Sequence, residues 1–187
     1  MKCIYTMLKT KLIVGLWNPW KEYLKTRHNI GFNIIDWIVD YSEWTKFMFN
    51  KKFNSDISIF RDWKYVIIFA KPQTYMNLSW EAVSKILSYY KIDFKNLLVI
   101  HDELDLQEWR IKLKRNWWNN WHNWLKSIDL KIWTNKYWKL KCGIWRPDEK
   151  WQVVDYVLWK LPNDVLQKFE SQKDYIFGLV RQFLVAN

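Results

Sequence analysis

Histidine is the residue type whose unperturbed pKa, about 6.5, best suits acid–base chemistry near neutral pH. The chain has three histidines. His28 lies between a polar loop and an apolar helical pattern, and His101 is followed by Asp102 directly after a fully apolar run. Because a carboxylate can orient an imidazole and stabilise its protonated form, a general base made of His28 and Asp102 is chemically sensible, although a lone histidine in a sequence is more often structural. A purely structural role for these residues is the alternative.

The acidic run that begins at Asp102 permits a second kind of chemistry. Asp102, Glu103 and Asp105 offer carboxylate oxygens, which hard divalent cations prefer as ligands. The sequence shows no second group of ligands to complete a metal site. The serines also lack the glycine-rich turn that surrounds a nucleophilic serine, so water is the expected nucleophile. We therefore expect neither a metal nor a cofactor.

A dinucleotide-binding loop is an alternative interpretation of the first segment. If Trp17 and Trp20 stood for glycine, residues 15–20 would read G-L-G-N-P-G, which has the spacing of such a loop. An Asn-Pro break and the charged stretch 21–27 delay the next helical pattern, whereas a dinucleotide-binding loop leads straight into its helix. A nucleotide-dependent oxidoreductase is therefore a weaker hypothesis than a hydrolase.

Strand-like and helical patterns alternate along the chain. The strands and helices that they predict must position the candidate side chains. Apolar residues at helical spacing predict helices over 29–44 and 78–90, the second with Ser79 as N-cap, and a last helix opened by Pro162 and Asn163. Apolar or alternating runs predict a hairpin over 56–70 and strands over 11–16, 97–100, 110–114 and 139–144. We expect an α/β fold with a twisted mixed β-sheet flanked by helices.

Length and composition fit one domain with a substantial core. The 187 residues are 50% hydrophobic and no linker divides them, so we expect one domain over 1–187, with 1–10 as a candidate disordered extension. Lys9 and Lys11 interrupt the apolar N-terminal stretch and no run is long enough for a membrane span, which favours the cytoplasm. A net charge of +11 favours a polyanionic partner, with nucleic acid as the leading candidate. The two cysteines show no disulfide or metal-ligand pattern.

Glycine is far rarer in this chain than in an average protein. At the usual frequency of about 7%, roughly thirteen glycines are expected, whereas the chain has four, beside sixteen tryptophans. The hairpin corner at Asp62-Trp63 predicts a type I′ turn, in which both central residues have positive φ and glycine is favoured. Tryptophans also crowd the loop-like segment 117–124.

We hypothesise that most of these tryptophans are glycines in the native protein, because the source organism reads the UGA codon as glycine. A genuinely tryptophan-rich protein is the alternative. Single residues such as Trp37, on an apolar helix face, can be authentic.

Several sequence blocks between Lys11 and Leu161 together form a specific pattern. They are KLIVGLWNPWKEYLKTRHNIGFNIID, KPQTYMNLSWEAV, HDELDL, WHNWLKSI, GIWRP and VVDYVLWKL. In order and spacing they resemble the signature blocks of the bacterial peptidyl-tRNA hydrolase family. The resemblance implies an enzyme that cuts the ester bond between peptide and tRNA and frees the tRNA for translation. The chain departs from the family chiefly where the family has glycine, at Trp17, Trp20, Trp80, Trp109, Trp117, Trp118, Trp121, Trp124, Trp145 and Trp159.

The resemblance also implies roles for individual residues. It makes His28 the activator of the hydrolytic water, Asp102 the group that orients His28, and Asn18 the residue that tells a blocked peptidyl amide from a free amine. It implies contacts with the tRNA end or the peptide end at Tyr23, Tyr75, Met76, Asn77 and Asn123. Basic residues that flank the expected cleft in sequence are candidates for phosphate contacts: Lys112, Lys114, Arg115, Lys141 and Arg146.

The expected partner is therefore any peptidyl-tRNA, bound by a monomer with no membrane. A noncatalytic RNA-binding relative of the same fold is the alternative. The presence of the His28 and Asp102 pair favours the enzyme, because a protein that only binds RNA has no physical need for a general base.

Overall fold

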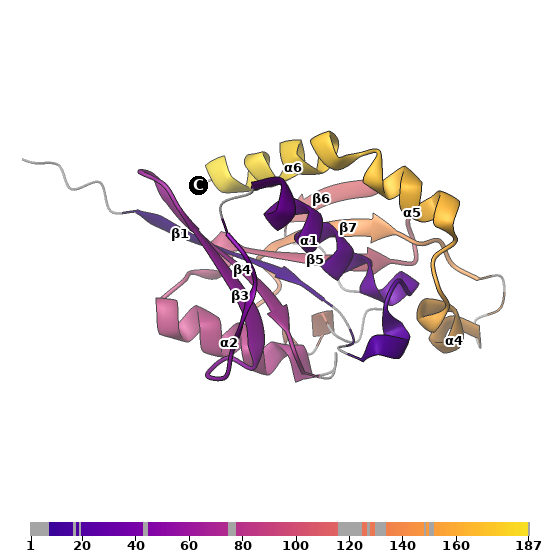
Figure 1. Ribbon diagram of the computed structural model, residues 1–187, viewed down its shortest axis with the longest axis horizontal. Helices are drawn as coiled ribbons and strands as arrows, with labels where there is room; N and C mark the ends of the chain where they lie inside the picture. The colour runs from indigo at the N-terminus through magenta and orange to yellow at the C-terminus, as the bar shows by residue number, and fades with distance from the viewer. Residues whose placement is uncertain are drawn as a thin grey trace, which may run out of the picture.

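One seven-stranded sheet runs through the part of the chain that the structure describes, in the order β2-β3-β4-β1-β5-β7-β6 (Figure 1). This computed structural model describes residues 8–16, 18, 20–42, 45–74, 78–115, 125–126, 128–129, 134–147, 149 and 152–186. β4, β1, β5 and β7 are parallel neighbours, and β2, β3 and β6 join the sheet by antiparallel pairing. The strands are β1 (Lys9–Gly15), β2 (Met48–Asn50), β3 (Ser55–Arg61), β4 (Tyr65–Pro72), β5 (Leu97–Glu103), β6 (Ile111–Arg115) and β7 (Trp138–Gly143).

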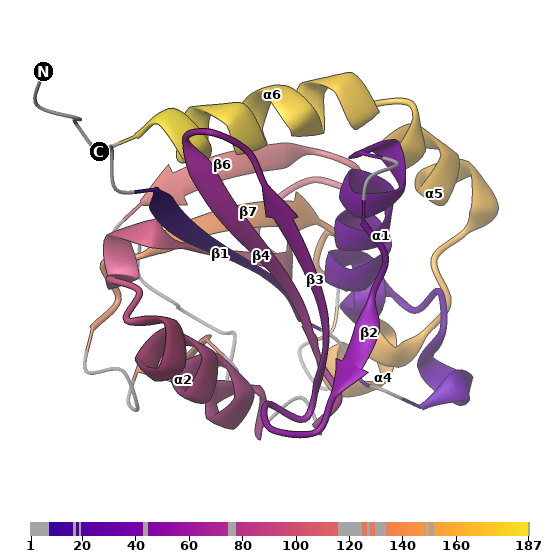
Figure 2. The ribbon, with the colours of Figure 1, turned by 60° about the vertical axis from the view of Figure 1, so that its left-hand side comes forward.

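Helices cover both faces of the sheet. They are α1 (Ile30–Ser42), α2 (Ser79–Tyr90), α4 (Val153–Leu158), α5 (Asn163–Glu170) and α6 (Lys173–Val185), with the 3-10 helices η1 (Lys21–Tyr23), η2 (Arg27–Asn29) and η4 (Phe94–Asn96). Figure 2 shows α2 on one face and α1 and α6 on the other. Within the described residues, no helix combines the length and the apolar character that a membrane crossing requires.

The core has two halves because successive side chains of a strand point to opposite faces. Ile13 and Ile100 pack toward α1 and α6, whereas Leu12, Val14 and Val99 pack toward α2. β1 and β5 are therefore buried on both faces, which explains why their sequences are continuous apolar runs. The α/β fold with a mixed sheet is confirmed.

Some predicted boundaries change. β1 begins at Lys9, so Lys9 and Thr10 pair with β4 instead of belonging to an N-terminal extension. The prediction of Ser79 as N-cap is wrong: Leu78 occupies that position, without a side-chain cap, and Ser79 is the first helical residue. The predicted last helix is divided into α5 and α6 at Ser171 and Gln172. The Gln172 side chain donates to the carbonyl oxygen of Trp109 at this break, at 2.9 Å.

The β3–β4 hairpin is confirmed, but its predicted type I′ corner is wrong. The backbone N–H of Asp62 donates to the carbonyl oxygen of Tyr65 at 3.0 Å, and the Asp62 carboxylate accepts from the N–H groups of Lys64 and Tyr65 at 2.7 and 2.6 Å. Neither Asp62 nor Trp63 has a positive φ. The aspartate side chain forms this corner, so Trp63 needs no glycine-like backbone.

Candidate active site

The buried pair of His28 and Asp102 lies where β5 ends and α1 begins. Alternation along β5 directs Ile100 and Asp102 toward the face that α1 covers. His28 belongs to η2, which leads directly into α1. The His28 Nδ1 is 2.8 Å from the Asp102 Oδ1, and the two residues are 5% and 2% exposed. The geometry matches the expectation that a carboxylate at the end of a core strand orients this imidazole.

This hydrogen bond has a chemical consequence for the imidazole. A carboxylate accepts at Nδ1, so Nδ1 carries the hydrogen of the neutral ring and the lone pair is at Nε2. The carboxylate also stabilises the ring when Nε2 takes up a proton. The pair can therefore act as a general base.

A thiol beside the pair is kept out of the chemistry. Cys142 is paired with Asp102 across β5 and β7 and is fully buried. Burial, and then the charge of Asp102, raise the pKa of the Cys142 thiol well above its usual range. A thiol with a raised pKa is a poor nucleophile near neutral pH, which supports its interpretation as a packing residue.

The loop after β1 brings two other predicted residues to the same turn. Asn18 and Tyr23 are half-buried, and both are tied through their backbones to Asn29, the residue that follows His28. The Asn18 N–H donates to the Asn29 Oδ1 at 3.0 Å, and the Asn29 Nδ2 donates to the Tyr23 carbonyl oxygen at 2.6 Å. The structure thus places Asn18, Tyr23 and His28 around one buried side chain.

Sequence reasoning missed a second buried residue beside His28. The Arg27 guanidinium lies over the ring of Tyr156, 4.2 Å from its centroid, and donates to the carbonyl oxygen of Lys160 at 3.1 Å. It also stands 3.7 Å from the carboxylate of Glu108. These contacts hold α4 and residues 159–161 against η2 (Figure 1). The position of Arg27 directly before His28 was the available signal.

The candidate phosphate-binding residues of β6 and β7 lie on both faces of the sheet. Lys112 and Lys114 are exposed, and Lys112 is paired with Lys141 across β6 and β7. Alternation along β6 directs Arg115 to the opposite face, where its guanidinium lies 5.7 Å from the ring centroid of Trp138. Arg115 therefore lies on the other face of β6 from Lys112 and Lys114, which is the face of Asp102.

Lysine and arginine side chains form ion pairs with the acidic run 102–105, which the sequence analysis considered as a metal site. The Lys141 ammonium is 2.6 Å from the Glu103 carboxylate, and the Arg146 guanidinium pairs with Asp105. Asp102 bonds to His28 on the other face of the strand. Among the residues that the structure describes, no group of three His, Cys, Asp or Glu side chains has the arrangement of a metal site.

The remaining predicted substrate contacts lie outside the described residues: Tyr75, Met76, Asn77 and Asn123.

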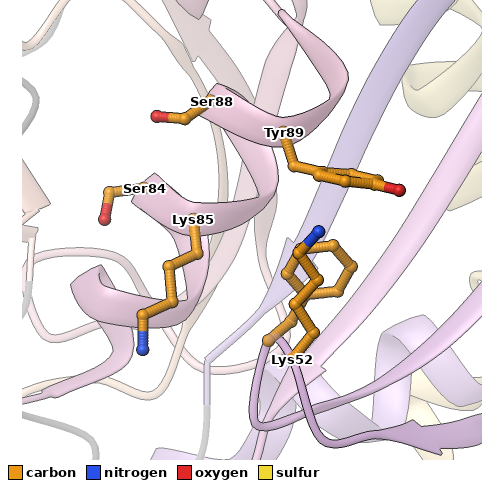
Figure 3. Close-up of a pocket in the computed structure, with 6 residues that line it drawn as sticks. Lys52, Ser84, Lys85, Ser88 and Tyr89 are labelled. Atoms are coloured by element: carbon orange, nitrogen blue, oxygen red, sulfur yellow. The ribbon is translucent and has the colours of Figure 1, made fainter.

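A separate open hollow of about 490 Å³ lies between α2 and the β2–β3 turn (Figure 3). In it, the Lys52 ammonium stands 3.5 Å from the ring centroid of Tyr89. The hollow is on the α2 face, so the sheet separates it from His28 and Asp102.

Comparisons with known proteins agree on one family. The family model described as peptidyl-tRNA hydrolase matches residues 12–186. The peptidyl-tRNA hydrolase of Rickettsia prowazekii is 46% identical over 178 residues, covering 94% of this chain and 95% of that protein. The enzyme of Wolbachia pipientis wMel is 44% identical over 154 residues, covering 81% and 82%. A crystal structure of peptidyl-tRNA hydrolase from Acinetobacter baumannii has a TM-score of 0.84 at 30% identity, covering 93% of this chain and 92% of that chain.

Proposed function

Since the chain belongs to the peptidyl-tRNA hydrolase family and hydrolyses peptidyl-tRNA, we propose that His28 is its general base. In this proposal, Asp102 orients the His28 imidazole and balances the positive charge of its protonated form. The observation that carries this proposal is the 2.8 Å hydrogen bond between two buried side chains at the end of β5. Burial excludes bulk water from this bond, which strengthens the interaction between the imidazolium and the carboxylate.

The proposed reaction uses one water molecule and no cofactor. The His28 Nε2 takes a proton from the water as its oxygen attacks the carbonyl carbon of the ester. The tetrahedral intermediate then collapses, the bond to the ribose oxygen of the tRNA breaks, and the imidazolium returns its proton to that oxygen. The products are a peptide with a free carboxylate and a tRNA that can be used again.

The other residues of the proposed site bind the two ends of the substrate. We assign Asn18 to the peptide amide next to the ester, because an asparagine side chain offers both a donor and an acceptor to a peptide bond. Tyr23 would stack on the tRNA end. Asn77 and Asn123 are proposed for substrate binding and for the developing oxyanion, and Tyr75 and Met76 for contacts in the same cleft.

Phosphate contacts are proposed for Lys112, Lys114 and Lys141, which share the face of β6 and β7 opposite to the one where Asp102 bonds to His28. Arg115, on the face of Asp102, is proposed for the same role. Their charges would attract the tRNA backbone without reading its sequence, so any peptidyl-tRNA is the proposed substrate. Arg146 is proposed with them, although it shares its charge with Asp105. The proposed working state is a cytoplasmic monomer.

We further propose that most of the tryptophans at the family's glycine positions are glycines in the native protein. Trp109 and Trp145 support this, because each has a φ of 56°, in the left-handed region where a bulky side chain is strained. Mass spectrometry of peptides from the natively expressed protein tests the proposal. Glycine at 109 and 145 is the expected result, and tryptophan at both would refute it.

The test of function is the release of N-acetyl-amino acid from N-acetyl-aminoacyl-tRNA. We would compare the chain as written with a form that carries glycine at the tryptophan positions named above, and with the glycine form carrying His28→Ala. We expect hydrolysis by the glycine form, sparing of free aminoacyl-tRNA, and loss of turnover with retained tRNA binding in the His28→Ala form. Full activity after His28→Ala would remove His28 from the mechanism. A folded glycine form that binds tRNA without hydrolysis would favour the noncatalytic relative.

A further inference from the structure

The side chain of Asn29 is fully buried beside the proposed catalytic base and uses its amide group in three hydrogen bonds. Its Oδ1 accepts from the backbone N–H of Asn18 at 3.0 Å, and its Nδ2 donates to the carbonyl oxygen of Asn18 at 3.3 Å. The same Nδ2 donates to the carbonyl oxygen of Tyr23 at 2.6 Å. One side chain therefore links the segments that carry Asn18 and Tyr23.

These bonds begin where the sheet stops supporting the loop. β1 ends at Gly15, and the N–H of Leu16 still donates to the carbonyl oxygen of Ile100 at 3.0 Å. Beyond this point, Asn29 engages both backbone polar groups of Asn18, as a neighbouring strand would. The loop position of Asn18 is thus fixed by a side chain of the turn that carries His28.

The chemistry of these contacts requires an amide. The three partners are one N–H donor and two carbonyl acceptors, so the side chain must accept on one atom and donate on the other. An aspartate of the same shape could accept from Asn18 but would direct an oxygen at both carbonyl groups. An alanine would remove this partner from both backbone groups of Asn18, whereas the Tyr23 carbonyl oxygen would keep its bonds from the N–H and hydroxyl groups of Thr26, at 3.1 and 2.9 Å.

We infer that Asn29 is a positioning residue for substrate selection: it fixes Asn18 and Tyr23 relative to His28, so that a blocked peptide amide is held while the ester faces the base. This inference rests on the proposed function, in which Asn18 binds the amide and Tyr23 the tRNA end. Asn29 itself is fully buried, and its amide group bonds to the backbones of Asn18 and Tyr23. The effect of Asn29 on the discrimination between blocked and free substrates passes through Asn18. This effect must therefore disappear when the Asn18 side chain is removed.

The test measures kcat/KM for N-acetyl-aminoacyl-tRNA and for free aminoacyl-tRNA, in the glycine form described above and in the same form carrying Asn29→Ala, Asn18→Ala or both. We expect Asn29→Ala to lower kcat/KM for the blocked substrate by about 10-fold to 100-fold, because small displacements of binding groups have effects of this size. The ratio between the two substrates should fall by at least about 10-fold, and Asn29→Ala should change this ratio no further in the Asn18→Ala background. The pH dependence of kcat should stay unchanged, because the bond between His28 and Asp102 is retained.

Lys11→Met is the matched control for lost stability. Lys11 is buried at the opposite end of β1 and donates to the carbonyl oxygens of Phe183 and Ala186, so its loss should lower the thermal midpoint and leave the substrate ratio unchanged. If Asn29→Ala does not fold, Asn29→Asp carries the test, because it keeps the shape and the bond from the Asn18 N–H. Equal losses for both substrates, or a further fall of the ratio in the Asn18→Ala background, would overturn the inference while leaving the hydrolase function intact. A glycine form that is folded and inert would overturn both.

Discussion

Gly31 lies so close to β5 that a Cβ atom on it would stand 2.6 Å from the carbonyl oxygen of Ile100. The same atom would be 2.8 Å from the carbonyl oxygen and 2.9 Å from the nitrogen of Leu16. These are backbone atoms of core segments, which cannot move aside as a flexible side chain can. The absence of a side chain at Gly31 therefore sets how closely η2 and His28 approach Asp102.

Gly31→Ala should lower both stability and turnover. The overpacked start of α1 is expected to lower the free energy of unfolding by about 1–3 kcal/mol and to move His28 away from Asp102. Gly178→Ala is the matched control: Gly178 lies in α6, and a Cβ there would meet nothing within 4 Å. The control should gain about 0.5–1 kcal/mol without a change in kcat. Urea denaturation and steady-state kinetics measure both, and an active, undisturbed Gly31→Ala protein would contradict the close approach.

Asp102→Asn should lower kcat far more than it lowers tRNA binding. The amide keeps the shape of the carboxylate but removes its charge and favours the wrong tautomer of His28, an effect worth roughly 10²–10⁴ in kcat in comparable pairs. His28→Ala should lower kcat by a similar factor, and the double variant should be no worse than His28→Ala alone. Additive losses would show that the two residues act independently.

Trp145→Gly should stabilise the protein by about 1 kcal/mol, because glycine adopts a φ of 56° without strain and Trp145 is half exposed. Trp63→Gly is the control, since Trp63 is more exposed, at 83%, and does not have a positive φ. It should gain nothing. Urea midpoints measure the two changes, and an equal gain in both variants would show that strain at 145 is not the cause.

Arg27→Met should loosen α4. The substitution removes the donor to Lys160, the pairing with Glu108 and the cation over the ring of Tyr156, while the apolar stem is kept. We expect faster hydrogen exchange in α4 and a loss of about 1–3 kcal/mol of stability. Arg181→Met, at an exposed position of α6, should change neither quantity. Unchanged exchange in α4 would mean that other contacts hold this helix.

The stability contribution of Lys139 should rise in alkaline solution. Burial, which outweighs the opposing charge of Asp129, lowers the pKa of fully buried Lys139 from 10.5 to about 8. Between these values the unfolded chain binds more protons than the folded chain, so the free energy of unfolding increases with pH. Relative to Lys139→Met, the unsubstituted protein should gain up to about 3 kcal/mol between pH 7 and pH 10.5. Lys112→Met, at an exposed site on the next strand, should follow the unsubstituted protein at every pH.

The sequence alone identified the main elements and the central pair. α1 and α2 carry apolar residues at helical spacing, and β1 and β5 are short continuous apolar runs, because the sheet and its helices bury those residues. His28 and Asp102 could be paired from the types of their side chains and from their places at element boundaries. The corner at Trp63 could not be predicted, because the side chain of Asp62 supplies the turn's hydrogen bonds and removes the need for positive φ.

Only the tertiary structure decided which residues support that pair. Asn29 bonds to Asn18, Gly31 contacts Ile100, and Arg27 meets Tyr156, and each contact joins segments that no local pattern relates. Arg115 shows the same limit: alternation along β6 indicates its face, but not that its guanidinium lies over the ring of Trp138 on β7. Local sequence patterns indicate which residues are buried, whereas the partner of a buried polar group depends on which distant segments the tertiary fold brings together.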